Sequence, residues 1–364
     1  MKLIYLIAGT YRPAGMERVL ANKANWFAGQ GIDVLIVTTD QRGRESAFAM
    51  DPRIRTVDLG IGYEDNNGGS FVSKLLLYPF KQLKHRRRLT ALLKREKADV
   101  VVSMFCNDAS FVPGIKDGSH KVLEIHFSRY KRLQYGRKGL WALADKWRSA
   151  NDARVAARFE RFVVLTDEDA GYWGTMPNIR VIPNARTFTF DTPSSLENRQ
   201  VLAVGRYSYQ KAFDRLVAAW KMIDTEGWTL RIAGAGDELP DLPDNVKTGL
   251  SGDMKQEYLD SSIFALSSRY EGLPMVLLEA QAAGLPIVSF TCKCGPRDVV
   301  TDGVDGILVE EGDVRGLAKA LKRLMDDREL RRKMGEAAYK ASDRFDEEKI
   351  MRQWLQLFEE LCIR

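Results

Sequence analysis

The stretch RYEGLPMVLLE, residues 269–279, follows a short apolar run and begins a helical pattern. The run at Ile263–Ser267 has the length and composition of a buried strand. Gly272 permits a tight turn, and Pro274 suits the first position of a helix, where no helical carbonyl would accept an amide hydrogen. The free amides of a first helical turn attract phosphate groups. This stretch therefore predicts a strand, a ligand-binding turn and a helix within one α/β unit.

The alternation of strand and helix continues on both sides of this stretch through the second half of the chain. Apolar runs predict strands at Val201–Val204, Thr229–Ala233, Val246–Thr248, Ile263–Ser267, Ile287–Ser289 and Ile307–Val309. Helical patterns occupy Ala212–Asp224, Pro274–Ala283 and Val314–Asp326. Such alternation is typical of a doubly wound domain with a parallel sheet. We therefore expect one domain of this kind over residues 199–345.

The first half of the chain shows the same pattern. Its predicted strands are Leu3–Ala8, Val34–Thr38, Arg55–Leu59, Asp99–Met104, Lys121–His126 and Phe162–Leu165, and its clearest helices are Met16–Gln30 and Val72–Glu96. Strands that are apolar on both faces are typical of a buried parallel sheet. We expect a first domain over residues 1–184, a polar linker over 185–198, and a C-terminal helix within 346–364 that packs back on the first domain.

The predicted fold class is therefore α/β, with two Rossmann-like doubly wound domains that face each other across a cleft. A length of 364 residues agrees with this, since one domain takes roughly 150 residues. In open α/β sheets, ligands bind beyond the carboxyl ends of the strands. The loops after the strands are thus where binding residues are expected.

Composition narrows the possible environments. The net charge of +6 and the charged fraction of 29% are those of a soluble globular protein. No apolar run approaches the roughly 18 residues that a membrane-spanning helix needs, and the apolar start of the chain reads better as a buried strand than as a signal peptide. We expect a cytoplasmic protein, peripheral on the cytoplasmic face of a membrane. The cysteines form no Cys-x-x-Cys pair, so we expect reduced thiols and no zinc site; they are Cys106, Cys292, Cys294 and Cys362.

Charged residues follow two of the predicted strands in the second domain. Gly205 and Arg206 come directly after one strand, and Lys211 follows five residues later. Arginine can bind a diphosphate through two hydrogen bonds, whereas lysine acts as a compact charge. Glu271 and Glu279 lie on either side of a predicted helix start, and carboxylates accept hydrogen bonds from sugar hydroxyls. Taken singly, these residues also fit a solvated basic loop, a helix cap and a helix surface.

Together these motifs resemble the family 4 retaining glycosyltransferases of the GT-B fold. The resemblance rests on Glu-x7-Glu at Glu271 and Glu279, on Gly205-Arg206 with Lys211, on AGAG at residues 233–236, and on EAQAAGLPIV at 279–288. The motifs occur in the family's order and are strongest in the second domain. The tail GPRDVVTDGVDG at 295–306 is similar to bacterial members that build polysaccharides and lipid-linked glycans.

The resemblance implies a role for each matching residue. Arg206 and Lys211 would hold the donor diphosphate and stabilise it as it leaves. Glu279 would bind the ribose hydroxyls of the nucleotide, and Glu271 the hydroxyls of the donor sugar. Backbone amides near Leu273 and Met275, together with Gly205, would contact the phosphates or the sugar. Pro274 has no amide to give.

Two positions in the first domain complete the predicted site. The segment TYRPAGMER, residues 10–18, joins the first strand to the first helix, and it has Ala14-Gly15 where family members often carry Gly-Gly. Gly15 keeps a flexible backbone that would approach the phosphates or the acceptor; an ordinary strand-to-helix turn is the alternative. His126 ends a predicted strand where the family has a histidine near the donor sugar. Thr166 and Asn184 also end strands that face the cleft.

Basic residues concentrate in two segments of the first domain. Lys74–Lys97 holds nine lysines or arginines against Glu96, and Phe127–Arg148 holds seven against Asp145, with apolar and aromatic residues between them. A solvated helix face would have this composition, and so would a patch for an anionic membrane surface or a diphosphate-linked acceptor. No nucleic-acid motif accompanies the charge, so we expect no nucleic-acid partner.

These observations predict an enzyme that transfers a sugar from a nucleotide diphosphate donor, with UDP as the expected nucleotide, to a glycan or lipid-linked acceptor in bacterial cell-surface glycan assembly. We expect no metal and no other cofactor, because the cations of Arg206 and Lys211 can neutralise the diphosphate and no Asp-x-Asp motif lies beside a donor-domain strand. A sugar-nucleotide epimerase or hydrolase of the same fold remains an alternative, as does an inactive sugar-nucleotide-binding subunit.

Overall fold

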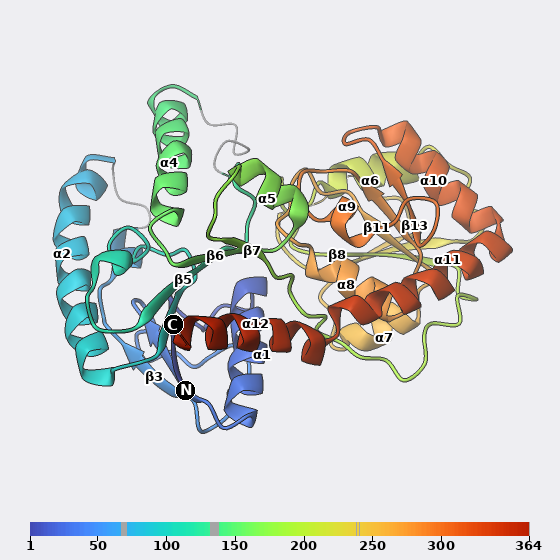
Figure 1. Cartoon of the computed structure of the whole chain (residues 1–364). Coiled ribbons are helices and arrows are strands. Elements are labelled where there is room, and N and C mark those ends of the chain that lie inside the picture. The colour runs from blue at the N-terminus through green and yellow to red at the C-terminus, as the bar shows by residue number, and fades with distance from the viewer. Residues whose placement is uncertain (67–70, 132–137, 238, 240, 364) are drawn as a thin grey trace.

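The computed structural model describes residues 1–66, 71–131, 138–237, 239 and 241–363. Two parallel sheets form two separate domains, one blue to green and the other yellow to red (Figure 1). The predicted fold class, α/β with two Rossmann-like domains, is confirmed. No helix among the described residues is long and apolar enough to cross a membrane.

The first sheet has the strand order β3-β2-β1-β4-β5-β6-β7, and all of its strand pairs are parallel. Its strands are β1 (Lys2–Ile7), β2 (Asp33–Thr38), β3 (Arg55–Asp58), β4 (Val100–Ser103), β5 (His120–Glu124), β6 (Arg161–Val164) and β7 (Ile179–Val181). The order reverses between β1 and β4, so the loops after these two strands diverge and leave a crevice at the carboxyl edge.

Alternate residues of β1 show why this sheet is buried on both faces. Leu3 and Tyr5 share a core with α1 (Gly15–Gly29) and α12 (Glu347–Cys362). Ile4 and Leu6 point to the other face, where they share a core with side chains of α2 (Phe71–Glu96), α4 (Leu140–Ala156) and α5 (Asp167–Trp173). Side chains of a strand alternate between its faces, so a continuous apolar run is what a sheet covered on both sides requires.

The second sheet repeats this plan with the order β10-β9-β8-β11-β12-β13. Its strands are β8 (Gln200–Val204), β9 (Thr229–Ala233), β10 (Val246–Gly249), β11 (Ile263–Leu266), β12 (Ile287–Phe290) and β13 (Gly306–Val309). Its helices are α6 (Phe213–Trp220), α7 (Met254–Leu259), α8 (Met275–Ala282), α9 (Pro296–Val299), α10 (Val314–Asp326) and α11 (Arg328–Ala341). The order reverses between β8 and β11, whose loops carry the main predicted binding motifs.

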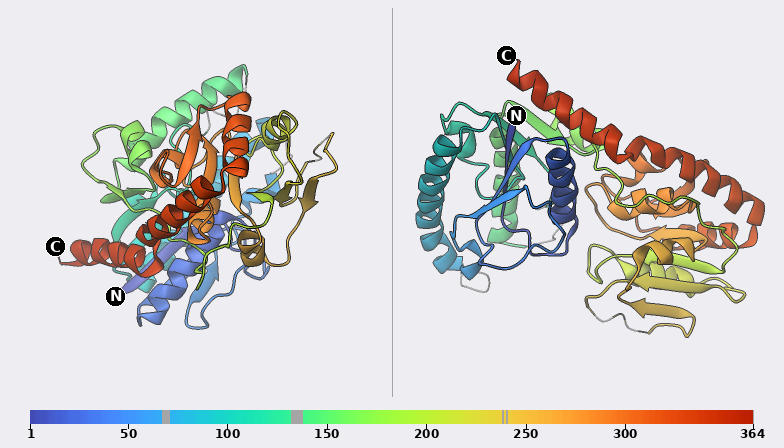
Figure 2. Two further views of the ribbon diagram at one scale, coloured as in Figure 1. Left: turned by 90° about the vertical axis from the view of Figure 1, so that its right-hand side faces the viewer. Right: turned by 90° about the horizontal axis from the view of Figure 1, so that it is seen from below.

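The chain crosses between the domains twice. Residues 185–198 form the first crossing; there Leu196 is buried in a second-domain core and the Ser194 hydroxyl donates to the carbonyl of Ser261 at 2.6 Å. After α11 the chain returns, and α12 lies against the first domain beside the N-terminus (Figure 2). The buried apolar residues of α12 belong to the same core as β1; they are Ile350, Met351, Trp354, Leu357, Phe358 and Leu361.

Several elements differ from the sequence expectation. The edge strand β7 was not predicted because its three residues are only half-buried or exposed and show no apolar run. Helices α4, α5, α7, α9 and α11 were not singled out either; three of them have seven residues or fewer, too short to show a helical period. Helix α6 ends at Trp220 rather than at Asp224. Residues 221–227 then form turns that lead into β9.

Candidate active site

A cavity of about 530 Å³ lies between the two domains, lined by residues of both. All nine predicted site residues line it. They are Gly15 and His126 from the first domain, and Gly205, Arg206, Lys211, Glu271, Leu273, Met275 and Glu279 from the second. The second-domain residues come mainly from the loops after β8 and β11, where the strand order reverses. Asn184 lines the cavity as well.

Gly205 makes room for the lysine of the β8 loop. Its φ of +153° lies in a region that favours glycine. A Cβ atom at this position would stand 2.9 Å from Cε of Lys211. The glycine therefore lets the Lys211 stem run along the backbone toward the cavity.

Lys211 and Glu271 form an ion pair at the cavity wall. Nζ of Lys211 donates to Oε1 of Glu271 at 2.7 Å, and the hydroxyl of Ser268 donates to the same oxygen at 2.6 Å. The lysine side chain is 17% exposed and the glutamate 8%, so a ligand in the cavity can reach the pair. An anionic ligand that binds Lys211 would share or replace its contact with Glu271.

Arg206 is the second cation of this wall and differs from Lys211 in being exposed. Its guanidinium forms no hydrogen bond or ion pair with any residue that the structure describes. A guanidinium in this state can accept a diphosphate without first losing a protein partner.

Helix α8 begins at the cavity with no side chain capping it. Its N-cap is Pro274, and no side chain of a described residue caps it by a hydrogen bond. Leu273 and Met275 flank this position at the cavity wall. Uncapped amides at a helix start carry partial positive charge and suit an anionic ligand.

Glu279 lies at the buried end of the same wall. The hydroxyl of Tyr258 donates to its Oε2 at 2.7 Å. Burial raises the pKa of Glu279, although this hydrogen bond and the charge of Arg18 oppose the shift. The side chain of Thr187 opposes the shift as well.

The first-domain wall is held by ion pairs around Glu64. Tyr11 and Arg12, from the loop after β1, both donate to Glu64, and Arg44 lies 3.2 Å from Glu64. The guanidinium carbon of Arg44 lies 3.2 Å from the centre of the Tyr11 ring. These contacts fix the segment that leads to Gly15.

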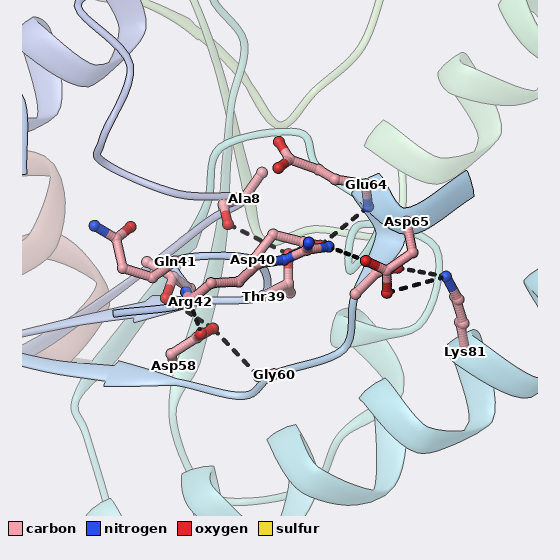
Figure 3. Close-up of polar contacts among 12 residues, drawn as sticks. Ala8, Thr39, Asp40, Gln41, Arg42, Asp58, Gly60, Glu64, Asp65 and Lys81 are labelled. Atoms are coloured by element: carbon pink, nitrogen blue, oxygen red, sulfur yellow. Dashed lines mark hydrogen bonds and ion pairs between the residues drawn. The ribbon is translucent and has the colours of Figure 1, made fainter. Parts of the chain in front are cut away.

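The network extends to helix α2, as Figure 3 shows. The amide of Glu64 donates to Oδ1 of Asp40 at 3.0 Å. Arg42 pairs with Asp65, and Asp65 lies 3.9 Å from Nζ of Lys81 on α2. The carboxyl edge of β2, the turn η1 (Tyr63–Asn66) and α2 are thus linked by charged side chains.

His126 lies two residues beyond the end of β5, with its side chain 6% exposed. Its Nε2 stands 3.0 Å from Oε1 of Glu124. The domains approach closely here, since a Cβ on Gly272 would lie 2.8 Å from the carbonyl oxygen of His126. A glycine at position 272 therefore permits the two walls to meet at the histidine.

Sequence reasoning gave too little weight to one residue behind the cavity wall and to one residue that lines it. Strand alternation places Glu124 on the face opposite Ile125, and no sequence pattern assigns it a role; that face is covered by α1 and α12. Arg18 was quoted within a motif but given no role, yet it lines the cavity, with its guanidinium carbon 4.6 Å from the Phe48 ring centre. Its place three residues after Gly15, in the first turn of α1, was the available signal.

Other candidate positions have structural roles. The hydroxyl of Thr166 caps α5 by accepting from the amide of Asp169 at 3.0 Å. Cys292 and Cys294 are buried, and Sγ of Cys294 lies 3.6 Å from Oδ1 of Asp169, which joins the two domains. Among the described residues, no group of three or more His, Cys, Asp and Glu side chains is placed to hold a metal ion.

Two family models match the chain, one on each domain. The family model "Glycosyl transferase 4-like domain" matches residues 14–185, and "Glycosyl transferases group 1" matches residues 185–341. The two matches meet at residue 185, where the chain first crosses between the domains.

The chain is similar to several curated proteins. It is 34% identical over 215 residues to the amylovoran biosynthesis glycosyltransferase AmsD of Erwinia amylovora, a match that covers 54% of this chain and 61% of that protein. The chain thus spans less than two thirds of AmsD. It is 27% identical to an uncharacterised glycosyltransferase of Haemophilus influenzae over 97% of this chain and 98% of that one. It is 25% identical, over 99% of each chain, to a Campylobacter jejuni enzyme named as an α-1,4-N-acetyl-D-galactosaminyltransferase acting on a diNAcBac-PP-undecaprenol glycan.

Solved structures share the fold over almost the whole chain. A sucrose-phosphate synthase from Thermosynechococcus elongatus matches with a TM-score of 0.81 at 18% identity, covering 99% of this chain and 98% of that one. HepE of Anabaena, solved in complex with UDP and glucose, matches with a TM-score of 0.71 at 16% identity, covering 99% and 100%. With both family models matched in order across residues 14–341, the chain belongs to the family 4 glycosyltransferases of the GT-B fold.

Proposed function

We propose that this protein is a retaining glycosyltransferase that moves a sugar from a nucleotide diphosphate donor, UDP in the first instance, to an acceptor hydroxyl in bacterial cell-surface glycan assembly. The observation that carries the proposal is the convergence of Arg206, Lys211 and the uncapped start of α8 on one wall of the interdomain cavity. Three sources of positive charge at one place suit the diphosphate of a donor. HepE was solved in complex with UDP, and the Campylobacter enzyme is named for a diphosphate-linked lipid; both support the choice of donor and acceptor.

The proposed chemistry needs positioning and charge stabilisation. The bond between the sugar's anomeric carbon and the diphosphate oxygen breaks, and the acceptor oxygen bonds to the same face of that carbon. The acceptor proton passes to the departing phosphate oxygen. Negative charge builds up on the diphosphate as this happens, and Arg206 and Lys211 are placed to stabilise it. No metal or other cofactor is required by this proposal.

The remaining site residues take roles that follow from their places. Glu279, buried beside Tyr258, would accept hydrogen bonds from the ribose hydroxyls of the nucleotide. Glu271 and His126, on facing walls, would contact the donor sugar between them. Gly15 brings the first-domain backbone close to the phosphates or the acceptor without a side chain.

A donor panel with and without acceptor tests this function. We expect one nucleotide sugar to raise the melting temperature most, to be hydrolysed slowly alone, and to be consumed quickly with acceptor, giving a product whose anomeric configuration matches the donor. Conversion of the donor alone into an isomeric sugar nucleotide would instead establish an epimerase. Tight donor binding without turnover would establish a binding subunit, and an inverted product would refute the retaining mechanism.

We further propose that the first domain docks on an anionic membrane to reach a lipid-linked acceptor. Large apolar side chains are exposed in the first halves of α2 and α4: Leu77 (45%), Phe80 (72%), Leu83 (61%), Leu143 (63%) and Trp147 (66%). Figure 1 shows both helices beginning at the upper edge of the first domain. Exposed apolar groups among basic residues suit the interface of an anionic bilayer.

Not every basic residue of these segments is free to face a membrane. Lys84 donates to the carbonyl of Gly60 at 2.8 Å, and Arg88 donates to the carbonyl of Leu59. Arg86 and Arg87 are exposed and point to solvent without such contacts among the described residues. Arg132, Tyr135 and Arg137 lie outside the described residues, and the side chains of Phe71, Lys74, Leu75, Leu76 and Trp141 are likewise not described.

Co-sedimentation with lipid vesicles tests the docking. The wild-type protein should bind vesicles that contain anionic lipid at low salt and dissociate at 1 M salt, where the Debye length is roughly 3 Å. Arg86→Ser/Arg87→Ser should lower the bound fraction without changing nucleotide affinity. The matched control is Arg315→Ser/Lys319→Ser, at two exposed positions of α10 in the second domain. If the wild type ignores anionic vesicles at low salt, the acceptor is better sought among soluble glycans.

A further inference from the structure

A buried ion pair lies behind the cavity wall of the first domain. Lys23 of α1 is 1% exposed and Glu124, the last residue of β5, is 0% exposed; Nζ and Oε1 stand 2.5 Å apart. Apolar residues of similar size would stabilise a domain core at least as well as a buried ion pair does. The roles proposed above use neither residue, so the pair calls for a separate explanation.

The surroundings close the pair off from bulk solvent. The ring centre of Trp354, on α12, lies 3.5 Å from Nζ of Lys23. Tyr5 of β1 is also fully buried, and burial together with the charge of Glu124 raises the pKa of its hydroxyl, which stays neutral. Within the described part of the chain, the ammonium of Lys23 and the imidazole of His126 are the groups placed against this carboxylate.

His126 connects the pair to the cavity. Its Nε2 stands 3.0 Å from Oε1 of Glu124, the same oxygen that contacts Lys23. Burial acts to raise the pKa of Glu124, but the charge of Lys23 and the contact with His126 outweigh it and lower the pKa to about 2. The two atoms are close but are not aligned for a hydrogen bond. At this distance a lone pair on Nε2 would be repelled by the carboxylate, which favours a proton on this nitrogen. Nδ1 is then the nitrogen left for a ligand.

We propose that, within the glycosyl-transfer site proposed above, Glu124 is a positioning residue that holds the His126 imidazole with its proton on Nε2, and that Lys23 keeps Glu124 ionised. This assigns the C-terminal helix a part in the site, because Trp354 covers the lysine. The orientation of His126 would follow from a side-chain series, Trp354–Lys23–Glu124–His126, that begins outside the cavity. The inference rests on the proposed function only for its effect on transfer; the state of the imidazole can be measured without any substrate.

Nitrogen-15 NMR of the histidine rings reads that state directly. The chain has three histidines, His85, His120 and His126, and the spectrum of His126→Gln identifies the signals of the third. In the wild type, the His126 shifts should show a proton fixed on Nε2. In Glu124→Gln they should change, because an amide can present either its oxygen or its NH₂ to the ring. The signals of His85 and His120 should stay in place and serve as internal controls.

Kinetics supply the second readout. Glu124→Gln should lower kcat by about 10- to 100-fold, by analogy with the loss seen when a partner that orients a metal-bound histidine is removed. The dissociation constant for free UDP should stay within about twofold, since the nucleotide is proposed to bind the second domain. A structural role alone would lower the folded fraction and leave the kcat of the folded protein unchanged.

A double variant guards against loss of folding. Lys23→Met/Glu124→Met removes both charges together and keeps the volume, so it should fold even if Glu124→Gln does not. It should show the same change in the His126 shifts. Wild-type His126 shifts in either folded variant would overturn the proposal. If instead the shifts change but the wild type transfers no sugar, the positioning stands and the proposed function fails.

Discussion

One lysine–glutamate pair lies on the second-domain wall of the cavity, and another lies behind the first-domain wall at nearly the same separation. Lys211 and Glu271 stand 2.7 Å apart in the second domain, and Lys23 and Glu124 stand 2.5 Å apart in the first. The two pairs differ in the exposure of their side chains. Lys211 and Glu271 are 17% and 8% exposed, whereas Lys23 and Glu124 are 1% and 0% exposed. The chemistry is the same and the access to solvent is not.

This difference decides what each pair can do. A diphosphate in the cavity can reach Lys211, so the contact with Glu271 is one that a ligand can exchange. Nothing in the cavity can reach Lys23, whose charge is covered by Trp354. A pair that a ligand can reach can bind and release that ligand. An enclosed pair can only hold its neighbours in place, and loss of one partner would leave a buried charge unpaired at a large cost in stability.

The largest expected effect is on stability. Lys23→Met should lower the free energy of unfolding by about 3–5 kcal/mol, because it leaves the carboxylate of Glu124 buried without its main partner. Lys211→Met, the matched change in the reachable pair, should cost about 1 kcal/mol or less, since water and Ser268 can compensate Glu271. Denaturant unfolding measures both. Equal losses would show that burial does not distinguish the pairs.

The second-largest effect should be a loss of stability in acid that comes from the buried pair Lys23–Glu124. The pKa of Glu124 is about 2 in the folded protein, below the ordinary value of 4.5. Its contribution is therefore complete above pH 4.5 and is lost as the pH falls from 4.5 toward 2. Between pH 6 and pH 2, the wild type should lose on the order of 2–3 kcal/mol more free energy of unfolding than Lys23→Met/Glu124→Met does. Parallel stability curves for the two proteins would contradict this assignment.

For the rate of sugar transfer, the accessible pair should matter through direct contact with the donor. Lys211→Met removes a contact that strengthens as the leaving group gains charge, worth roughly 1.5–3 kcal/mol, or about 10- to 100-fold in kcat/KM. The folded fraction should be unchanged, as circular dichroism can verify. Arg206→Met should behave similarly. A folded and fully active Lys211→Met protein would remove Lys211 from the donor site.

A smaller effect separates the two glutamates of the second domain. Glu279→Ala should weaken binding of free UDP by about tenfold, through lost hydrogen bonds to the ribose of roughly 1.5 kcal/mol. Glu271→Ala should leave UDP affinity nearly intact, since the change frees Lys211, and should damage transfer instead. Isothermal titration gives both affinities. Equal losses of UDP affinity would mean that the two roles are not divided in this way.

The smallest expected effect is that of a chelator. Activity should survive excess EDTA, because Arg206 and Lys211 supply the positive charge that a metal would otherwise bring to the diphosphate. The spacing Asp-x-Asp does occur at Asp167 and Asp169, but in the first domain, where Asp169 accepts from Arg129 and Trp173. Loss of activity in EDTA that manganese restores would place a metal at the donor site.

The second-domain wall could be predicted from sequence because its residues lie in short, contiguous segments. Gly205, Arg206 and Lys211 fall within seven positions, and Glu271 and Glu279 lie on one loop and helix. Parallel strands place the loops at their carboxyl ends along one edge. Once β8 and β11 are recognised as neighbouring strands, the loops that follow them must lie close together. Residues of both loops line the cavity.

The enclosed pair could not be predicted in this way. Lys23 and Glu124 are separated by 101 positions, and Trp354 lies farther still along the chain. Strand alternation correctly places Glu124 on the face opposite Ile125. It does not say that α12 returns to cover that face, and without the covering helix a glutamate there reads as a solvated side chain. Contacts across the chain depend on tertiary packing, which no local pattern contains.

Helix α12 has a consequence for how the protein is made. Its apolar side chains belong to the same core as the first strand of the chain, so the domain that leaves the ribosome first is finished last. Until residues 347–362 emerge, one face of the first sheet lacks part of its cover, although the second domain is already complete. Domains usually fold in order of synthesis. In this chain the first domain instead needs the last helix to be synthesised before it can finish folding. A chain that ends at residue 345 would contain a whole second domain and an incomplete first domain.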